Sequence, residues 1–180
     1  MKIACIGWGS LIWRPESLPI QEKWFEDGPL LPIEFTRHSS DGRMTLIIDE
    51  QAEPVRTLWA LMTTSILDEA IEALKEREGA KKTETIHFVT ADTEQMTGIK
   101  NEILKWVRTM NLDAAIWTAL SYSDKTNKQR PSIDYVLNHL RNLEHSKRKH
   151  AEEYIRKAPK QIDTEFRRQI EFTFGWTHQD

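Results

Sequence analysis

The sequence predicts an α+β fold, in which a small mixed β-sheet or barrel is flanked by helices and followed by a helical C-terminal extension. Three observations support this prediction. Short β-rich runs alternate with helical patterns over the first 120 residues, two of these runs flank a hairpin turn, and helical patterns dominate after residue 132. Hairpins combined with crossover helices are typical of a mixed sheet with helices packed outside it.

The predicted strands are short and bounded by turn residues. The first is an apolar run that ends at Gly7 and indicates a buried strand. The segment 39–43, Ser-Ser-Asp-Gly-Arg, has hairpin chemistry and joins the second strand to the third. In chain order, the predicted strands are Lys2–Ile6, Ile33–His38, Met44–Ile48, Val55–Met62, Thr83–Thr90 and Ala114–Leu120.

The strongest helical pattern follows the fourth strand. Thr64 or Ser65 can cap this helix, and Gly79 can end it. Its apolar stripe has the i, i+3, i+4, i+7 spacing of a buried helix face and consists of Leu67, Ala70, Ile71 and Leu74. A second helix is predicted over Thr93–Met110, and further helices run from residue 132 to about residue 172.

Composition and charge bear on the class of partner. With 180 residues and 39% hydrophobic content, the chain can form a full core, and its net charge of -3 gives no general reason to expect nucleic-acid binding. Residues 125–168 are rich in Lys and Arg, but acidic residues are interleaved there, so we interpret them as solvated helices. No apolar stretch approaches the ~20 residues of a membrane span, and the N-terminal run is too short for a signal peptide. We therefore expect a cytoplasmic protein with no membrane partner.

We also expect no metal site. The single cysteine, Cys5, excludes an internal disulfide framework and a zinc site built from cysteines. His139, His145 and His150 are spaced six and five residues apart, which puts them on different helix faces instead of the i, i+4 spacing of a helical metal pair. We expect these three histidines to be exposed to solvent.

Glu78 is the first candidate for a catalytic role. It continues the apolar stripe four residues after Leu74, so we expect it on the buried face of the helix at its last turn. Burial and the negative end of the helix dipole both favour the neutral carboxyl, a form that a proton-shuttling residue has to reach. Alternatively, the helix end frays and Glu78 points into water. Glu76 is the adjacent acidic residue, but it faces away from the stripe.

The second candidate site is the loop directly after the first strand, Gly7-Trp8-Gly9-Ser10-Leu11-Ile12-Trp13. Its glycines leave the backbone bare, so successive N–H groups could converge on a carboxylate or a phosphate. A dinucleotide-binding loop would need a third glycine at the position of Ile12. We therefore do not expect a nicotinamide cofactor.

Together these segments resemble one known family. Trp8-Gly9-Ser10-Leu11-Ile12-Trp13 resembles the Tyr-Gly-Ser-Leu-Ile-Trp signature of the ChaC-type glutathione-specific γ-glutamylcyclotransferases, and it is similar to the Tyr-Gly-Ser-Asn-Leu signature of other γ-glutamylcyclotransferases. Val55–Met62 and the helix ending in Arg77-Glu78-Gly79-Ala80 resemble the strand and helix that end in the family's catalytic Glu-Gly. Pro131-Ser132-Ile133-Asp134-Tyr135 resembles a Pro-Ser-x-x-Tyr segment of the family. The departure is Trp8, which replaces the usual tyrosine.

The resemblance implies a reaction and a set of residues. The substrate would be a γ-glutamyl small molecule whose α-amine attacks its own γ-carbonyl, releasing 5-oxoproline and an amine or peptide without a metal or cofactor. Glu78 would be the general acid/base. Substrate-binding roles fall on the backbone N–H groups of the loop and on two tyrosines, at positions Trp8, Gly9, Ser10, Leu11, Tyr122 and Tyr135. For the two tyrosines, packing with the hydroxyl on the surface is the alternative.

The resemblance ends near residue 140. We therefore expect a γ-glutamylcyclotransferase-like domain over residues 1–140 and a helical extension over residues 141–180 that packs on the same domain. The extension could cover the pocket, form a homodimer or dock elsewhere, and the sequence leaves open which γ-glutamyl compound is used. The alternative function is a non-catalytic or repurposed protein that binds a small molecule on the same fold.

Overall fold

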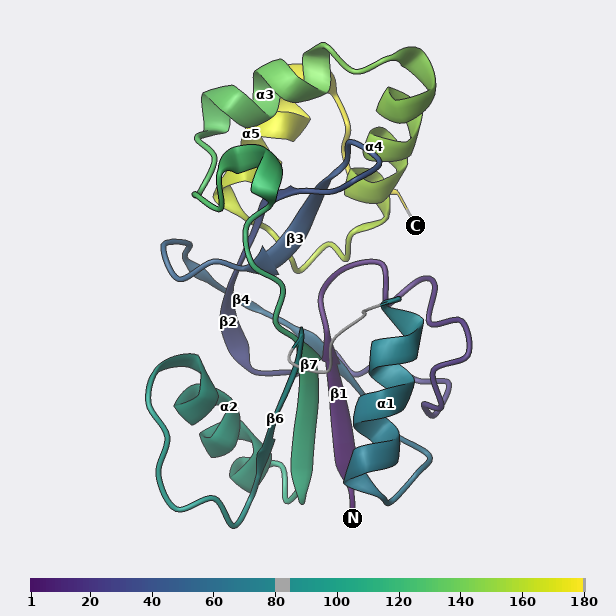
Figure 1. Cartoon of the computed structure of the whole chain (residues 1–180), viewed down its shortest axis with the longest axis vertical. Coiled ribbons are helices and arrows are strands. Elements are labelled where there is room, and N and C mark those ends of the chain that lie inside the picture. The colour runs from purple at the N-terminus through teal and green to yellow at the C-terminus, as the bar shows by residue number, and fades with distance from the viewer. Residues whose placement is uncertain (80–84, 180) are drawn as a thin grey trace. The chain divides into compact units, whose positions relative to one another are not determined.

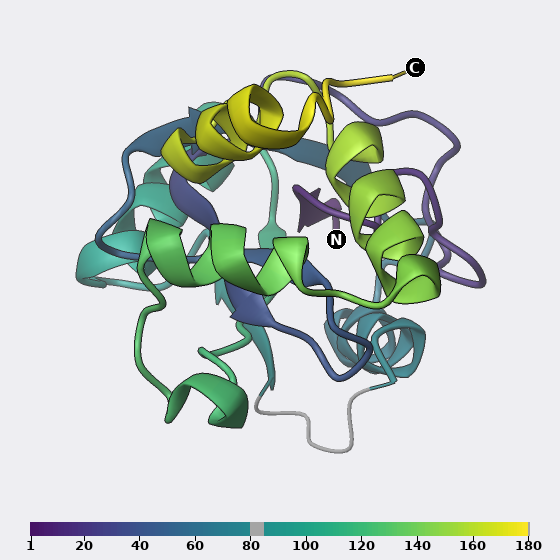
Figure 2. The same cartoon turned by 90° about the horizontal axis from the view of Figure 1, so that it is seen from above.

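The computed structural model describes residues 1–79 and 85–179. Their fold is α+β, as predicted, with helices packed on two β-sheets (Figures 1 and 2). The chain divides into two compact units, which are described separately. Unit 1 comprises Met1–Gly7, Arg14–Leu31 and Arg56–Ala119, and unit 2 comprises Trp8–Trp13, Pro32–Val55 and Leu120–Asp180.

Unit 1 contains a four-stranded mixed sheet with the strand order β5-β1-β7-β6. Its strands are β1 (Ile3–Gly7), β5 (Leu58–Leu61), β6 (Ile86–Thr90) and β7 (Ala114–Thr118). β1 pairs in parallel with β7 and antiparallel with β5, while β6 pairs antiparallel with β7. Every residue of β1 is buried, as the apolar run Lys2–Ile6 predicted.

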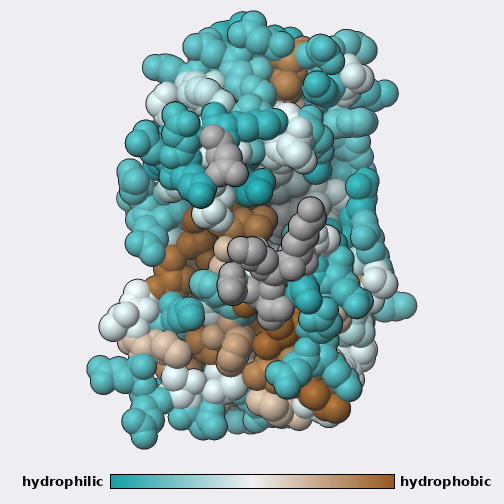
Figure 3. Space-filling view, in the orientation of Figure 1, coloured by the Kyte–Doolittle hydropathy of each residue, from teal (hydrophilic) through white to brown (hydrophobic). Residues whose placement is uncertain are grey.

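Two helices of unit 1 pack on β6 and β7: α1 (Leu67–Arg77) and α2 (Gly98–Thr109). The stripe predicted for α1 is confirmed, since Ala70, Ile71 and Leu74 are buried. The outer strand β6 keeps part of its surface open to solvent, with Phe88 45% exposed. In Figure 3, apolar residues gather on the face of unit 1 where β6 and β7 lie.

Unit 2 is built around a three-stranded sheet with the order β3-β2-β4. Its strands are β2 (Leu30–His38), β3 (Met44–Ile48) and β4 (Pro54–Arg56), of which β2 and β3 form the predicted hairpin. The register contains a β-bulge, because Phe35 and Thr36 of β2 together face Leu46 of β3. Three helices surround this sheet in Figure 2: α3 (Ile133–Arg141), α4 (His145–Lys157) and α5 (Glu165–Phe174). A short 3₁₀ turn, Asp124–Thr126, precedes them.

The prediction of one strand over Val55–Met62 is wrong, and so is the closed barrel as an alternative to a sheet. The described strands form two sheets, and the segment splits into β4 and β5 at Thr57. The Thr57 hydroxyl donates to the carbonyl of Pro29 at 2.7 Å, and the Gly28 N–H donates to the carbonyl of Thr57 at 3.1 Å. These long-range bonds hold Thr57 outside both ladders, so β4 pairs with β2 and β5 pairs with β1.

The predicted helix starts also need correction. Neither Thr64 nor Ser65 caps α1; the N-cap residue is Ile66, and the Thr64 hydroxyl donates to the side chain of Glu69 at 2.5 Å instead. α2 begins at Gly98 and not at Thr93, because Thr93 closes a turn by donating its N–H to Thr90. The first residues of the predicted strand Thr83–Thr90 lie outside the described residues, as does Ala80 of the Glu-Gly motif.

The C-terminal helices are tied to the sheet of unit 2 by a buried carboxylate. Glu34 of β2 accepts hydrogen bonds from the Thr164 hydroxyl at 2.5 Å and from the N–H of Phe166 at 3.1 Å, so it caps the start of α5. α3 contacts both α4 and α5, which places residues on either side of position 140 in unit 2. The domain boundary at residue 140 stays a prediction. None of the helices in the described residues is long and apolar enough to cross a membrane.

Candidate functional site

Glu78 lies at the C-terminal end of α1, where the apolar stripe predicted it. It is the C-cap residue, and its N–H donates to the carbonyl of Leu74 at 3.0 Å. Its side chain is 19% exposed, whereas Glu76 is exposed. Gly79 follows with a positive φ of 59°, which ends the helix in the left-handed conformation that glycine favours. The helix end is therefore formed and not frayed, and Glu78 is held in a partly buried position.

An adjacent arginine fixes the Glu78 carboxylate. Nη1 of Arg77 lies 2.5 Å from Oε1 of Glu78, while Nε and Nη2 donate to the carbonyl of Arg14 at 3.2 and 2.6 Å. The Arg77 side chain is almost completely buried. A planar guanidinium that makes several charge-assisted hydrogen bonds leaves a carboxylate little rotational freedom. This pairing is not among the sequence-based expectations, although Arg77 is the direct neighbour of Glu78.

Glu78 also acts on the buried strand β1. Burial raises the pKa of the Cys5 thiol, and the negative charge of Glu78 raises it further, while Arg77 acts in the opposite direction. Cys5 lies two residues before Gly7, where β1 ends and the chain continues into the glycine loop.

The glycine loop, Trp8–Trp13, is anchored to the edge strand β3 in unit 2. The indole Nε1 of Trp8 donates to the carbonyl of Leu46 at 3.3 Å, and the Trp8 side chain is buried. A turn within the loop is closed by the Ile12 N–H, which donates to the carbonyl of Gly9 at 3.0 Å. The residue that departs from the family signature thus makes a structural hydrogen bond with its side chain.

Two backbone amides of this loop are left without a protein acceptor in the described part of the chain. Gly9 and Leu11 are buried, and within residues 1–79 and 85–179 neither backbone N–H donates to an acceptor of the protein. Nearly all buried backbone N–H groups in proteins are satisfied by protein, water or ligand. Ser10 separates Gly9 from Leu11, so these are two amides of one loop and not a run of successive unpaired amides. Loop amides that converge on one point can bind a carboxylate or another anion.

Tyr135 lies in the first turn of α3. Ser132 caps this helix by accepting the N–H of Tyr135 at 3.1 Å, which gives the Pro-Ser-x-x-Tyr segment a role in starting the helix. The Tyr135 hydroxyl is 2.9 Å from Nδ1 of His38, and the His38 and His139 rings are 4.0 Å apart. The expected exposure of His139 is therefore wrong: it packs on His38 and donates from Nε2 to the carbonyl of Gly42 at 2.6 Å.

Tyr122 is a partner of a buried carboxylate. Its hydroxyl donates to Asp49 at 2.8 Å, and Arg130 pairs with the same carboxylate at 2.7 Å. The Asp49 side chain is completely buried. Two residues from the polar segment 120–131 are thereby bonded to the end of the β2–β3 hairpin.

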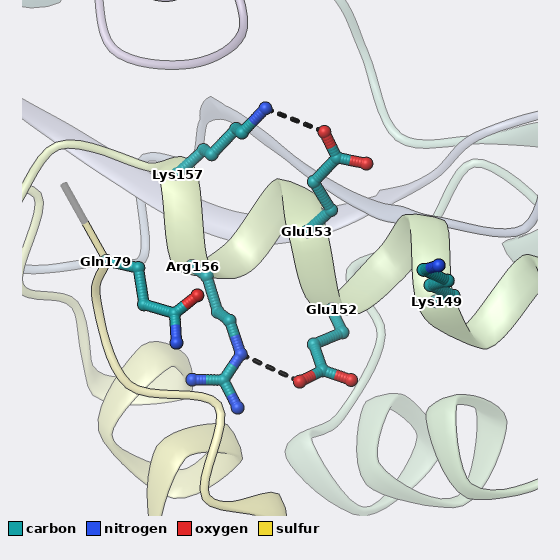
Figure 4. A pocket seen from close by; sticks show the side chains of 6 residues that line it. All are labelled: Lys149, Glu152, Glu153, Arg156, Lys157 and Gln179. Carbon is teal, nitrogen blue, oxygen red and sulfur yellow. Dashed lines mark hydrogen bonds and ion pairs between the residues drawn. The ribbon is translucent and has the colours of Figure 1, made fainter.

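A groove of about 380 Å³ lies along α4 (Figure 4). Its charges are largely paired with one another, since Arg156 contacts Glu152 and Lys157 contacts Glu153, each at 2.7 Å. Its lining residues are Lys149, Glu152, Glu153, Arg156, Lys157 and Gln179, none of which was a candidate from the sequence. Paired, half-exposed charges of this kind are typical of a solvated helix face. In the described part of the chain, no group of three or more His, Cys, Asp or Glu side chains could hold a metal ion.

The structure brings together some of the candidate residues. Glu78 belongs to unit 1, and the other candidates, Trp8, Gly9, Ser10, Leu11, Tyr122 and Tyr135, belong to unit 2. Trp8 and Gly9 share one cluster with Leu46 and with Tyr154 of α4, a residue that the sequence analysis missed. No local signal marks Tyr154, because its contacts are with residues far away in the sequence. No family model, curated protein or solved structure matches the chain.

Proposed function

We propose that this protein is a γ-glutamylcyclotransferase-like enzyme. The α-amine of a γ-glutamyl compound attacks the γ-carbonyl carbon of the same molecule, the new C–N bond closes the five-membered ring of 5-oxoproline, and the bond to the leaving amine or peptide breaks. The reaction needs no oxidant and no second substrate. Because nucleophile and electrophile belong to one molecule, holding them in a near-attack conformation lowers the barrier by several kcal/mol.

The observation that carries the proposal is the position of Glu78. The residue that resembles the family's catalytic glutamate ends α1 in a partly buried position and is fixed by Arg77. As a carboxylate it would take a proton from the attacking nitrogen, and as an acid it would return a proton to the leaving nitrogen. General acid–base catalysis of this kind contributes typically ~10²–10⁴-fold to the rate.

By the family resemblance, we also propose that the glycine loop of unit 2 contacts the substrate. In the cyclisation, the γ-carbonyl oxygen gains negative charge in the transition state, and the α-carboxylate of the substrate is charged throughout. Backbone N–H groups such as those of Gly9 and Leu11 would bind one of these oxygens without having to reorganise. The Trp8 side chain is engaged with Leu46, so we assign substrate contact at position 8 to the backbone.

The test is an assay of 5-oxoproline release. The purified protein is incubated with glutathione, γ-glutamyl-alanine and a γ-glutamylamine, and the same panel is run with Glu78→Gln. We expect release from one class of compound, and a fall of about 10²-fold or more in the variant, because the amide cannot carry the proton. Circular dichroism is used to check that the variant is folded, and calorimetric titration to check that it still binds the substrate, as we expect.

Glu76→Gln is the matched control. It removes a carboxylate from the same helix two residues earlier, at an exposed position, and is expected to keep full activity. Equal turnover by Glu78→Gln and the wild type would remove Glu78 from the mechanism. Absence of release from every compound, combined with binding of one of them, would favour the alternative of a repurposed binding protein.

A further inference from the structure

We infer that Tyr154, from the C-terminal helical segment, is a positioning residue for the glycine loop, and that its hydroxyl is the reason why residue 9 has to be glycine. This inference rests on the proposed function for its consequence in catalysis. It goes beyond the family resemblance, because Tyr154 lies after residue 140, where that resemblance ends.

The hydroxyl of Tyr154 occupies a defined place between the loop and β3. It accepts a hydrogen bond from the Leu46 N–H at 3.3 Å. The carbonyl of the same residue, Leu46, accepts the indole N–H of Trp8. β3 is an edge strand, and such strands expose backbone groups that need partners. At Leu46 both partners are side chains: one comes from the loop and the other from α4.

Further contacts hold the Tyr154 ring in place. Tyr154 is one of the buried residues of α4. Trp13, the last residue of the loop, meets its ring edge-on with the centroids 5.4 Å apart, and Phe35 does so at 6.3 Å. The guanidinium of Arg43 lies over the ring at 5.2 Å. Because the ring is packed on several sides and hydrogen-bonded through its hydroxyl, moving it would cost free energy through the contacts that are lost.

Gly9 packs directly against this hydroxyl. A Cβ atom added at residue 9 would lie 2.7 Å from the Tyr154 hydroxyl oxygen, which is closer than carbon and oxygen can approach without a shift. The next ring atom, Cζ, would lie at 3.7 Å, an ordinary van der Waals contact. Gly9 does not have a positive φ, so backbone conformation does not demand glycine there. Among the described residues, the atom that a Cβ at residue 9 would overlap is therefore the hydroxyl oxygen of Tyr154.

These distances predict that Tyr154→Phe rescues the defect caused by Gly9→Ala. Gly9→Ala alone would displace the loop and its amides, and we expect kcat/KM to fall about tenfold to a hundredfold, since overpacking and misplacement by a fraction of an ångström have costs of that order. Tyr154→Phe removes the oxygen and leaves the contact at Cζ. In the Tyr154→Phe background, Gly9→Ala should therefore cost about twofold or less, because an ordinary contact replaces the overlap.

Gly28 provides the matched control. A Cβ at residue 28 would lie 2.6 Å from the carbonyl oxygen of Thr57, in unit 1, so Gly28→Ala creates an overlap that does not involve Tyr154. Tyr154→Phe should leave the effect of Gly28→Ala unchanged. The single variants and both double variants are compared by kcat, by KM and by the midpoint of urea unfolding.

Hydrogen exchange of the Leu46 amide gives a readout that does not depend on turnover. Tyr154→Phe removes its acceptor, so we expect faster exchange at Leu46 while the amides of α5 keep their protection. If no γ-glutamyl compound is turned over, the proposed function fails, but the unfolding midpoints and Leu46 exchange still decide this inference.

Two outcomes would overturn the inference. Gly9→Ala could lower the activity or the unfolding midpoint equally with Tyr154 and with Phe at position 154, or Tyr154→Phe could also rescue Gly28→Ala. If Gly9→Ala does not fold, recovery of folded protein in the double variant is the expected rescue, and its failure to recover contradicts the inference.

Discussion

The hydroxyl of Tyr122 donates a 2.8 Å hydrogen bond to the buried carboxylate of Asp49. Burial alone would raise the pKa of Asp49, but hydrogen bonds from Arg130 and Tyr122 outweigh it and hold that pKa below its ordinary value. Burial and the hydrogen bond to Asp49 raise the pKa of Tyr122 to about 12. Tyr122 thus donates to a carboxylate of its own chain, which gives it a structural role, while its contact with substrate stays a prediction.

Replacing Tyr122 by phenylalanine tests this role. The loss of one hydrogen bond to a charged group should lower the free energy of unfolding by about 1.5–3 kcal/mol. Asp49 keeps its bonds from Arg130 and from the Gln51 N–H, so the variant should fold. Urea unfolding measures the loss, and we expect KM for the γ-glutamyl substrate to stay within a factor of about two because no substrate contact is removed. A large rise in KM at unchanged stability would instead assign Tyr122 to the binding site.

We predict that the folded protein loses stability in mild acid because of the His38 imidazole. Burial is the largest cause that lowers the pKa of His38 to about 4, and the charges of His139 and Lys125 act in the same direction, against the opposing charge of Asp41. Tyr135 faces the ring through its hydroxyl. Between about pH 6.5, the ordinary value for an unfolded histidine, and about pH 4, the unfolded chain binds a proton at this residue and the folded chain does not. The free energy of unfolding should therefore fall as the pH drops through this window.

His38→Gln should reduce that pH dependence. The measurement is urea unfolding at several pH values between about 7 and 4.5, where the wild type should lose stability more steeply than the variant. His87 also has a lowered pKa, caused by burial and then by Lys100, so it contributes a slope of the same sign. His87→Gln is the control that measures this second contribution. Identical slopes for the wild type and His38→Gln would show that His38 is not held neutral by the fold.

The parts of the molecule that could be predicted from sequence are those determined locally. The stripe of α1 and the position of Glu78 at its end follow from helical periodicity, which depends only on neighbours along the helix. The break at Thr57 could not be predicted in this way, because it depends on hydrogen bonds to Gly28 and Pro29 from a distant part of the chain.

In the candidate site too, local features could be predicted from the sequence and tertiary contacts could not. The glycine loop is visible as a motif, since its residues are consecutive. What fixes it is not visible, because Tyr154 and Leu46 reach it only through the packing of α4 and β3 in the folded chain. From the sequence, glycine at position 9 is explained by backbone access, whereas in the structure Gly9 also packs against the Tyr154 hydroxyl. The motif marks this loop as a candidate site, whereas tertiary packing determines what its residues contact in the folded chain.

Arg77 gives the sharpest test of how Glu78 is held. Arg77→Lys keeps the positive charge but loses the planar fork, so one ammonium cannot contact both Glu78 and the carbonyl of Arg14 as the guanidinium does. If the fork fixes the orientation of Glu78, kcat should fall about tenfold, because in the proposed mechanism the carboxylate acts in the chemical step and a misplaced group is less effective there. KM should change little, since Arg77 itself touches no substrate in the proposed mechanism.

The matched control is Arg14→Ala, which removes an exposed side chain but keeps the backbone carbonyl that Arg77 contacts. It should retain the kcat of the wild type. Urea unfolding of both variants separates positioning from stability, because a purely structural role for Arg77 would lower the midpoint without changing kcat at a temperature where the protein stays folded. A rise in KM with kcat unchanged would also contradict the role of Arg77 in orienting Glu78. It would instead indicate that Arg77 binds the carboxylate of the substrate.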